Sequence, residues 1–374
     1  MSRGVELRIA LGMRGGVSLA VWIGGACAEI DALRRAAPAG DAGGPGGGGF
    51  WSRVLGLAGI DAVAVDVMAG ASAGGLNGVI YAASQVYGFP AHALRDAWLD
   101  LGDLERMVRD GDDGGDGAAE GHPSLLRGDG YFFAQAYRTL RHLVTAPGGA
   151  APERPPRLDL TLTATLVEPV SRPGGPGDPG ARRQDRFAST FRFRNAGPGW
   201  LTDFPPAGSE GLDAALARLA LAARGTSSFP VAFEAAAVHA PRPPSFAGGP
   251  PPAEPGLAVD MARVFGDATS GGEPFVVVDG GVLDNIPLGH AIAAVADAPA
   301  GRPTRRVLVY VRPGADGPAP PAARAPTRGT DPRATWSVVR GIVRARIPPV
   351  TIAGDLDLIE QHNRRVQRTR RLRV

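Results

Sequence analysis

Residues 67–78 read VMAGASAGGLNG, and this short stretch raises the question of whether Ser72 is a nucleophile. Apolar residues lead into GASAG, a G-x-S-x-G pattern centred on Ser72 and flanked by Gly70 and Gly74. A chain with 54 glycines in 374 residues would produce this pattern about 0.3 times by chance, so the motif alone is weak. The residues around Ser72 must therefore separate a nucleophile from an ordinary turn serine.

The residues on both sides of Ser72 have the pattern of a strand that turns into a helix. Residues 61–69 form an apolar run of strand length, and residues 74–86 have helical length and periodicity. The chain opens in the same way, with a predicted strand over 5–11, a glycine turn, and a predicted helix within 18–36. Repeated strand–helix units predict an α/β fold with a largely parallel sheet.

The rest of the chain adds helices and more strands to this plan. Two segments alternate with period two, which is typical of antiparallel strands, and two later apolar runs read as buried strands. The predicted elements are helices over 91–108, 130–146, 212–224, 333–346 and 355–372, antiparallel strands within 157–169 and 185–195, and buried strands within 274–279 and 305–313.

Composition divides the chain into three parts. We expect residues 1–312 to form one α/β domain, residues 313–332 a Pro/Ala-rich loop, and residues 333–374 a helical, basic segment or the start of a further region. Residues 363–374 carry six arginines and no acidic residue. Two interpretations of these residues stay open: a solvated end, or an electrostatic contact with anionic lipid.

Residue usage excludes several kinds of chemistry. The chain contains no lysine, which excludes a P-loop lysine, a Schiff base and a Ser-Lys dyad. The net charge is only +3 with arginine and acidic residues interspersed, so we expect no nucleic-acid partner. Cys27 is alone, which excludes a disulfide framework. With neither a signal-peptide pattern nor a membrane span, we expect a cytoplasmic protein, at most peripheral to a membrane.

Ser72 can be interpreted in two ways. At a sharp strand-to-helix turn a serine points its hydroxyl outward, Gly70 and Gly74 leave room for the tight backbone, and the helix N-terminus favours developing negative charge. The alternative is a tight turn in which Ser72 caps the following helix.

A second glycine turn lies in LGMRGGVSLAVWIGG, residues 11–25. Gly12, Arg14, Gly15 and Gly16 lie between a predicted strand and helix, where glycines allow backbone N–H groups to point at one spot, as in an oxyanion hole. The alternative is a phosphate-binding loop. The spacing does not match G-x-G-x-x-G, and no acidic ribose partner follows at the expected distance.

The third feature is VVVDGGVLDNIPL, residues 276–288. Asp279 ends an apolar strand and is followed by Gly280 and Gly281. Because parallel strands present their C-terminal ends together, we expect the Asp279 carboxylate to reach Ser72 and to act as its base. The alternative is an Asp-Gly pair that only forms a turn.

Together these motifs resemble the patatin-like phospholipases. The set G-x-R-G, G-x-S-x-G and D-G-G-x-x-x-N-x-P occurs in the family's order over residues 5–290. The segment RGTSSFPVAF, residues 224–233, is loosely similar to the family's A-S-x-A-x-P segment, and MRGGVSLAVWIGG is similar to an actinobacterial subgroup. Ala10 and Leu11 replace the first two glycines of the family's loop, which affects the fine geometry of the oxyanion hole.

The resemblance implies a fold, a site and a reaction. It implies a three-layer α/β/α fold with a mainly parallel central sheet. It implies a Ser-Asp dyad in which Ser72 attacks an ester carbonyl and Asp279 takes the proton. The main oxyanion donors fall at Gly15 and Gly16, and Arg14 fits the family's basic position. The expected substrate is a lipid ester, and no metal or cofactor is implied.

Two alternatives of different classes stay open. An α/β-hydrolase would use a Ser-Asp-His triad, for which His290 and His362 follow Ser72 in the chain. Neither histidine lies at an evident strand-end loop, and His290 falls within the helix-like LGHAIAAVA. The second alternative is a non-catalytic relative that binds lipid without hydrolysing it.

Overall fold

The computed structural model of the chain describes residues 4–16, 20–36, 49–109, 124–146, 156–172, 184–196, 202–239, 245–266, 273–299, 301–312, 360–361 and 363–364. The loop predicted over 313–332 and the helices predicted over 333–346 and 355–372 lie outside these residues, apart from four positions from 360 to 364. The division into three parts therefore stays a prediction.

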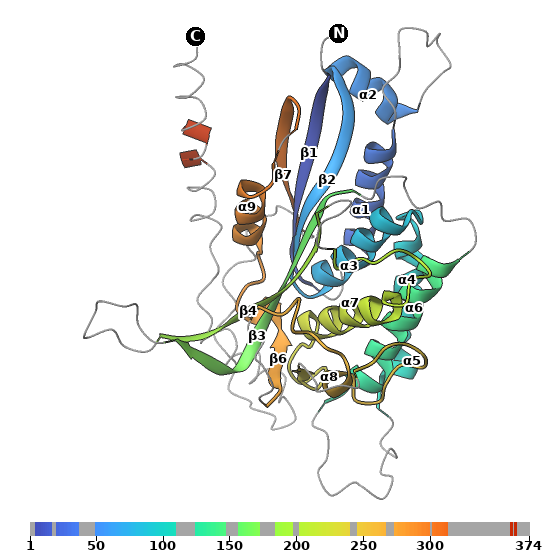
Figure 1. The fold of residues 1–374 in the computed structure, drawn as a ribbon, viewed down its shortest axis with the longest axis vertical. Helices are drawn as coiled ribbons and strands as arrows, with labels where there is room; N and C mark the ends of the chain where they lie inside the picture. The colour runs from blue at the N-terminus through green and yellow to red at the C-terminus, as the bar shows by residue number, and fades with distance from the viewer. Residues whose placement is uncertain are drawn as a thin grey trace, which may run out of the picture.

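A mixed sheet lies at the centre of the described chain (Figure 1). Its order is β5-β6-β3-β2-β1-β7, and β4 pairs with β3. The strands β1, β2, β3 and β7 run parallel to one another, whereas β4 and β6 are antiparallel to β3, and β5 is antiparallel to β6. The strands are β1 Val5–Met13, β2 Ile60–Gly70, β3 Leu158–Arg172, β4 Gln184–Asn195, β5 Ala236–Val238, β6 Phe275–Asp279 and β7 Thr304–Val311.

Helices cover both faces of the sheet, which gives three layers. Figure 1 shows α9 on one side and α1, α3, α4, α6 and α7 on the other. The helices are α1 Ala20–Arg35, α2 Phe50–Ala58, α3 Ala73–Tyr87, α4 Ala93–Leu101, α5 Leu104–Met107, α6 Ala134–Thr145, α7 Leu212–Thr226, α8 Pro255–Ala258 and α9 Leu288–Ala296, with a π-helical turn at Gly128–Phe133 and a 3-10 turn at Gly280–Val282. The predicted α/β/α fold with a mostly parallel sheet is confirmed.

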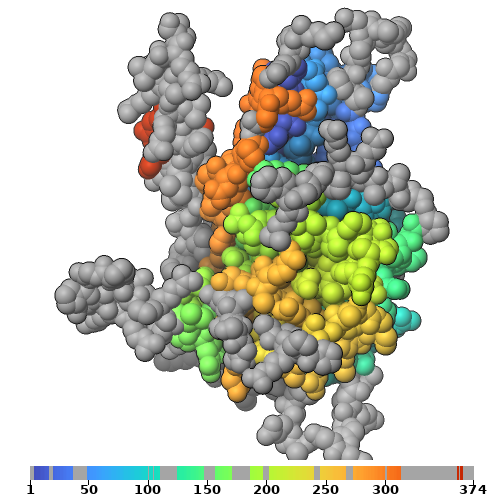
Figure 2. Space-filling view, in the orientation of Figure 1, coloured from blue at the N-terminus to red at the C-terminus, as the bar shows by residue number. Residues whose placement is uncertain are grey.

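The two layers of helix pack differently against the sheet. Every residue of α3 is buried, because this helix lies between the sheet and the outer helices α1, α4, α6 and α7. On the other face α9 packs through small side chains, with Ala291 and Ala294 against Ala10, Val67 and Ala69. Figure 2 shows the yellow-green to yellow-orange segments that follow β4 over the lower half of the molecule, whereas the deeper orange of α9 and β7 rises beside the blue N-terminal segment.

The predicted elements differ from the observed ones mainly at their ends. β1 continues to Met13, so the first glycine of the predicted turn lies within the strand. The helix predicted over 91–108 is broken into α4 and α5. The strands predicted within 157–169 and 185–195 form the antiparallel pair β3–β4. The short elements β5 and α8 were not predicted, because three or four residues are too few to show a period.

Candidate active site

Ser72 lies at a strained turn between β2 and α3. Its φ of 52° makes it a non-glycine residue in the left-handed region, which costs about 1–3 kcal/mol. The helix begins at once: the Leu76 N–H donates to the Ser72 carbonyl at 3.0 Å, and the Gly74 N–H donates to the Ala71 carbonyl at 2.9 Å. The turn therefore projects the Ser72 side chain beyond the end of the strand.

The two motif glycines make this turn possible. A Cβ atom on Gly70 would lie 2.6 Å from the Gly74 carbonyl oxygen and 2.7 Å from the Gly75 Cα. A Cβ atom on Gly74 would collide with the Met13 carbonyl oxygen at the end of β1. Gly70 and Gly74 are thus required for β1, β2 and α3 to meet at this point.

The hydrogen bonds of Ser72 separate its backbone from its side chain. The Ser72 N–H donates to Thr226 Oγ1 at 3.0 Å, which ties the turn to the end of α7. Ser72 occupies the N-cap position of α3, but its side chain makes no capping hydrogen bond. The hydroxyl is instead hydrogen-bonded to the Asp279 carboxylate. The alternative role of helix cap therefore does not describe this serine.

Ser72 and Asp279 come together because β2 and β6 meet end to end along β3. Gly70, the last residue of β2, pairs with Leu162, and Asp279, the last residue of β6, pairs with Ala164. β4 occupies the other edge of β3, so β2 and β6 share one edge and approach from opposite directions. The expectation that Asp279 ends a parallel neighbour of β2 is wrong, because β6 is antiparallel to β3.

The Asp279 carboxyl group is buried and has no charged partner among the described residues. Its side chain is held by the Ser72 hydroxyl and by the Gly281 N–H, the latter at 2.6 Å, so it also forms the turn that the Asp-Gly pattern suggests. Burial raises the pKa of Asp279 to about 7, and the two hydrogen bonds only partly oppose this shift. A carboxyl group with a pKa near neutrality is suited to exchanging protons with a hydroxyl.

The Asp279 turn is as closely packed as the Ser72 turn. A Cβ atom on Gly280 would collide with the Thr163 carbonyl oxygen on β3. A Cβ atom on Gly281 would lie 2.9 Å from the oxygen that Asp279 turns toward it. Gly280 and Gly281 therefore allow the chain to leave β6 directly beside β3.

The residues of the glycine turn at the end of β1 have different surroundings. Gly12 is part of β1 and pairs with β2 and β7, and the Arg14 N–H donates to the Val311 carbonyl at 3.1 Å. The buried Gly15 lies against Ser72, since a Cβ atom on it would be 2.8 Å from the Ser72 Cβ. Gly16 is half-buried and has open space around its Cβ position. Only Gly15 and Gly16 of the predicted set thus lie beyond the ladder of backbone hydrogen bonds.

The end of α7 supports both halves of the site, and sequence reasoning assigned it no role. Thr226 holds the Ser72 N–H, and the Ser228 carbonyl accepts the Asp279 N–H at 2.9 Å. Arg224 is almost fully buried and pairs with Asp129 at 3.3 Å and with Glu234 at 3.4 Å. The sequence signal for this role was the loose match of RGTSSFPVAF to the family's A-S-x-A-x-P segment. That match did not show which residues the segment contacts.

The Arg224 charge is balanced locally. Burial by itself would raise the pKa of Glu234, but the Arg224 charge and hydrogen bonds from backbone N–H groups and Ser124 lower it to about 2. The Gly128 and Asp129 N–H groups each donate to Glu234 at 2.8 Å. This cluster anchors the segment that carries Thr226 and Ser228.

Of the two histidines of the triad alternative, His290 is among the described residues and is paired with another group. His290 Nε2 is 3.1 Å from an Asp284 carboxylate oxygen, and both side chains are partly exposed. His362 lies outside the described residues. In the part of the chain that is described, no group of three or more His, Cys, Asp or Glu side chains could hold a metal ion.

Comparisons with known proteins place this geometry in a family. A family model described as patatin-like phospholipase matches residues 12–292, most of the chain. An uncharacterized membrane protein of Mycobacterium tuberculosis is 34% identical over 387 aligned residues, which cover 96% of this chain and 32% of that protein. The chain thus spans about a third of this relative's length. No solved structure matches the chain. Within the described residues, no helix is long and apolar enough to cross a membrane.

Proposed function

The chain belongs to the patatin-like phospholipase family, and from this premise we propose that it hydrolyses carboxylic esters of membrane lipids in the manner of a phospholipase A. The family acts on lipid esters, so lipid acyl hydrolysis is the general activity. The finer proposal is that Ser72 and Asp279 are a catalytic dyad. The observation that carries it is the hydrogen bond from the Ser72 hydroxyl to a buried carboxyl group that has no cationic partner among the described residues.

The proposed reaction has two halves. In the first, Ser72 Oγ attacks the ester carbonyl carbon while Asp279 takes the hydroxyl proton. The tetrahedral intermediate collapses, the C–O bond to the leaving alcohol breaks, and Asp279 returns the proton to that oxygen. In the second half Asp279 takes a proton from water, which attacks the acyl-serine carbonyl carbon. The bond to Ser72 Oγ breaks, Asp279 returns the proton to that oxygen, and the fatty acid leaves.

The negative charge of both intermediates develops on the former carbonyl oxygen. The glycine turn at residues 12–16 supports the proposal that a backbone N–H group stabilises this charge, because Gly15 places the turn against Ser72 and Gly16 has open space beside it. The Gly15 N–H donates to the Asn285 side chain, so the Gly16 N–H is the proposed donor. The N-terminus of α3 behind Ser72 adds a favourable dipole. Arg14, which is half-buried beside this turn, is proposed to brace it or to meet an anionic head group.

A matched pair of serine variants tests the function. Wild-type protein should hydrolyse a short-chain p-nitrophenyl ester, and Ser72→Ala should lose this activity by a factor of about 10⁴–10⁶. Ser84→Ala is the control, since Ser84 is also a buried serine of α3 but donates to the Phe89 carbonyl. A fluorophosphonate should label wild type and Ser84→Ala but not Ser72→Ala.

Other outcomes of this test identify the alternatives. A folded wild type that binds lipid vesicles but neither hydrolyses the ester nor reacts with the fluorophosphonate would be a non-catalytic lipid-binding relative. Full labelling of Asp279→Asn would show that another residue activates Ser72, and a histidine would then be the first candidate for that base.

A contact with the membrane surface is a separate part of the proposal. Residues 363–374 carry six arginines without an acidic residue, which supports attraction to anionic lipid at about 1 kcal/mol per basic residue at best. Deleting them should weaken binding to anionic vesicles, most clearly at low salt, and should leave soluble-ester hydrolysis unchanged. Equal vesicle binding before and after the deletion would remove this role.

A further inference from the structure

Asn285 is the residue of the D-G-G-x-x-x-N motif to which the dyad assigns no role. It follows the 3-10 turn after β6 and is partly exposed, so it lies beside the base loop and within reach of solvent. Its side-chain oxygen accepts a hydrogen bond from the Gly15 N–H at 3.0 Å. This bond joins two loops that are 270 residues apart in the chain.

The Asn285 amide lies between the nucleophile and the base. The Cβ position of Gly15 is 2.5 Å from Asn285 Oδ1 and 2.8 Å from the Ser72 Cβ. The Cβ position of Gly281 is 2.9 Å both from Asn285 Oδ1 and from an oxygen of Asp279. A single amide oxygen therefore contacts the loop of the proposed oxyanion donors and the loop of the proposed base.

The direction of the Gly15 N–H explains why this contact matters. Along β1 the backbone groups alternate sides, with the Met13 carbonyl accepting the Ala71 N–H on the β2 side and the Arg14 N–H donating on the β7 side. The next N–H on the β2 side belongs to Gly15, and β2 has ended there at Gly70. Asn285 supplies the acceptor that the missing strand residue would otherwise provide.

We propose that Asn285 is a positioning residue for the oxyanion loop, which it holds in place by accepting the Gly15 N–H. This role rests on the proposed function and deepens it. Glycines give the loop wide conformational freedom, so a loop of this composition needs an external restraint to keep its N–H groups directed at one spot. Asn285 provides that restraint from the same loop that carries Asp279.

The first experiment measures the restraint without any turnover. Amide hydrogen exchange of the peptide that contains Gly15 should become faster in Asn285→Ala. It should stay close to wild type in Asn285→Asp, because the aspartate keeps an oxygen that can accept the same N–H. Asn195→Ala is the matched control, since Asn195 is a buried asparagine whose amide donates to the Pro156 carbonyl elsewhere in the fold.

The second experiment reads the consequence for hydrolysis. Asn285→Ala should lower kcat for a soluble ester by roughly 10–100-fold with little change in KM, because a misplaced donor loses transition-state contact rather than substrate binding. Asn285→Asp should regain part of kcat. The acidic limb of the pH–rate profile of Asn285→Asp should move to higher pH, because a second carboxylate close to Asp279 opposes ionisation of the base. Asn195→Ala should change neither kcat nor the acid limb.

The results separate this proposal from the proposed function. Unchanged exchange at Gly15 in Asn285→Ala, or an Asn285→Ala enzyme as fast as or faster than wild type, would overturn the positioning role while leaving the dyad intact. A wild type without hydrolytic activity would overturn the function, and the exchange measurement would still decide whether Asn285 holds the loop.

Discussion

Asp66 and Asp279 are two buried aspartates of one sheet with opposite surroundings. Asp66 lies within β2 at 4% exposure, and Asp279 ends β6 at 2% exposure. Asp66 pairs with the Arg306 guanidinium through both oxygens and with Arg8 at 3.4 Å. Among the described residues, Asp279 has a hydroxyl and a backbone N–H as partners instead of a cation. Burial is therefore common to both residues, and only the partner differs.

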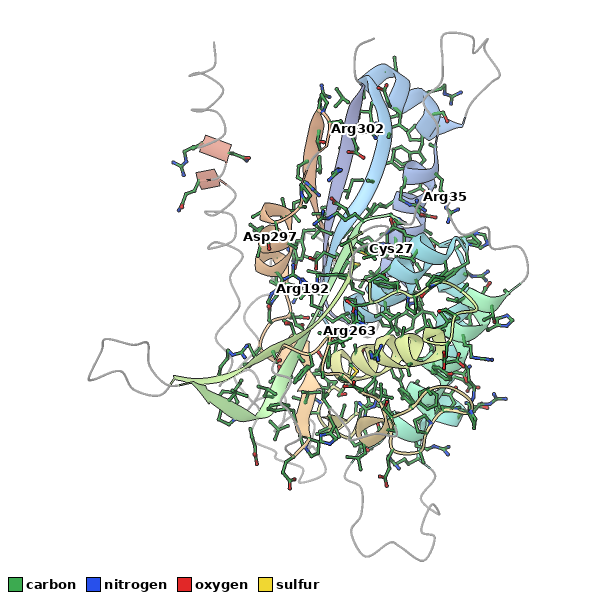
Figure 3. The ribbon with its side chains drawn as sticks, in the orientation of Figure 1. Cys27, Arg35, Arg192, Arg263, Asp297 and Arg302 are labelled. Carbon is green, nitrogen blue, oxygen red and sulfur yellow. The ribbon has the colours of Figure 1, made fainter. Side chains whose placement is uncertain are left out.

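The groups that surround the buried carboxylates differ between the two ends of the sheet. Near the N-terminal ends of β1 and β7, Glu6 binds Arg8 at 2.9 Å and Arg302 at 3.2 Å, and Figure 3 shows Arg302 at this end. Opposite charges there satisfy one another and hold the strands together. At the other end, within the part of the chain that the structure describes, the Asp279 carboxyl group has no counter-charge, which is the arrangement expected of a group that must exchange a proton.

Of the changes to these two aspartates, the largest expected effect comes from removing the charge of Asp279. Asp279→Asn should reduce ester hydrolysis by about 10³–10⁴-fold, because the amide keeps the turn but cannot take the Ser72 proton. Fluorophosphonate labelling should fall in parallel. Asp66→Asn is the control and should keep most of the activity per folded molecule. Comparable losses of hydrolytic activity in both variants would mean that the absence of a cation beside Asp279 among the described residues has no bearing on catalysis.

The same substitution should increase stability at neutral pH. The pKa of Asp279 is about 7 in the fold against an ordinary value of 3.8, so folding resists ionisation, and native stability falls as pH rises from about 4 to 7. Each unit of this shift corresponds to about 1.4 kcal/mol, so Asp279→Asn should be more stable than wild type at pH 8 by a few kcal/mol. The difference should nearly vanish at pH 4. Denaturant unfolding of both proteins at the two pH values measures it.

Asp66→Asn should act in the opposite direction. It removes the Asp66 carboxylate from Arg306 in a largely buried place and leaves Arg8 paired with Glu6, which should cost about 3 kcal/mol of the free energy of unfolding. Urea unfolding at neutral pH checks this. An Asp66→Asn protein as stable as wild type would show that the ion pairs at this end do not hold the strands together.

Much of this molecule could be predicted from its sequence. The ends of β2 and α3 fall within one residue of the predicted 61–69 and 74–86, because a buried strand is an unbroken apolar run and glycines mark its end. The family resemblance and the α/β/α layers are also confirmed. They could be predicted because three motifs occur at strand ends in the family's order. The identity of the catalytic residues stays a prediction.

Other features of the site could not be predicted. Hydrophobic periodicity shows which residues of β6 are buried but not the direction of the strand, so the end-to-end meeting of β2 and β6 was missed. Thr226 reaches Ser72 across 154 residues, and Asn285 reaches Gly15 across 270. Such contacts link a side chain to a backbone N–H, a donor that nearly every residue carries, so a motif can mark the side chain but not the N–H that it reaches.

The smallest effect, and the one that tests the comparison most directly, is the dependence of hydrolysis on pH. The base must be ionised to take the Ser72 proton, and the raised pKa of Asp279 keeps it protonated below about 7. The value of kcat/KM should therefore be level above that pH and fall about tenfold per unit below it, to about one hundredth of the plateau at pH 5. Because the described residues place no cation against Asp279, the midpoint should change little with salt. In Asp66→Asn the same midpoint should appear, since Asp66 lies in the ion-paired end of the sheet. A rate for wild type that stays level down to pH 5 would mean that the carboxyl group is ionised there, and the absence of a charged partner would then not distinguish Asp279 from Asp66.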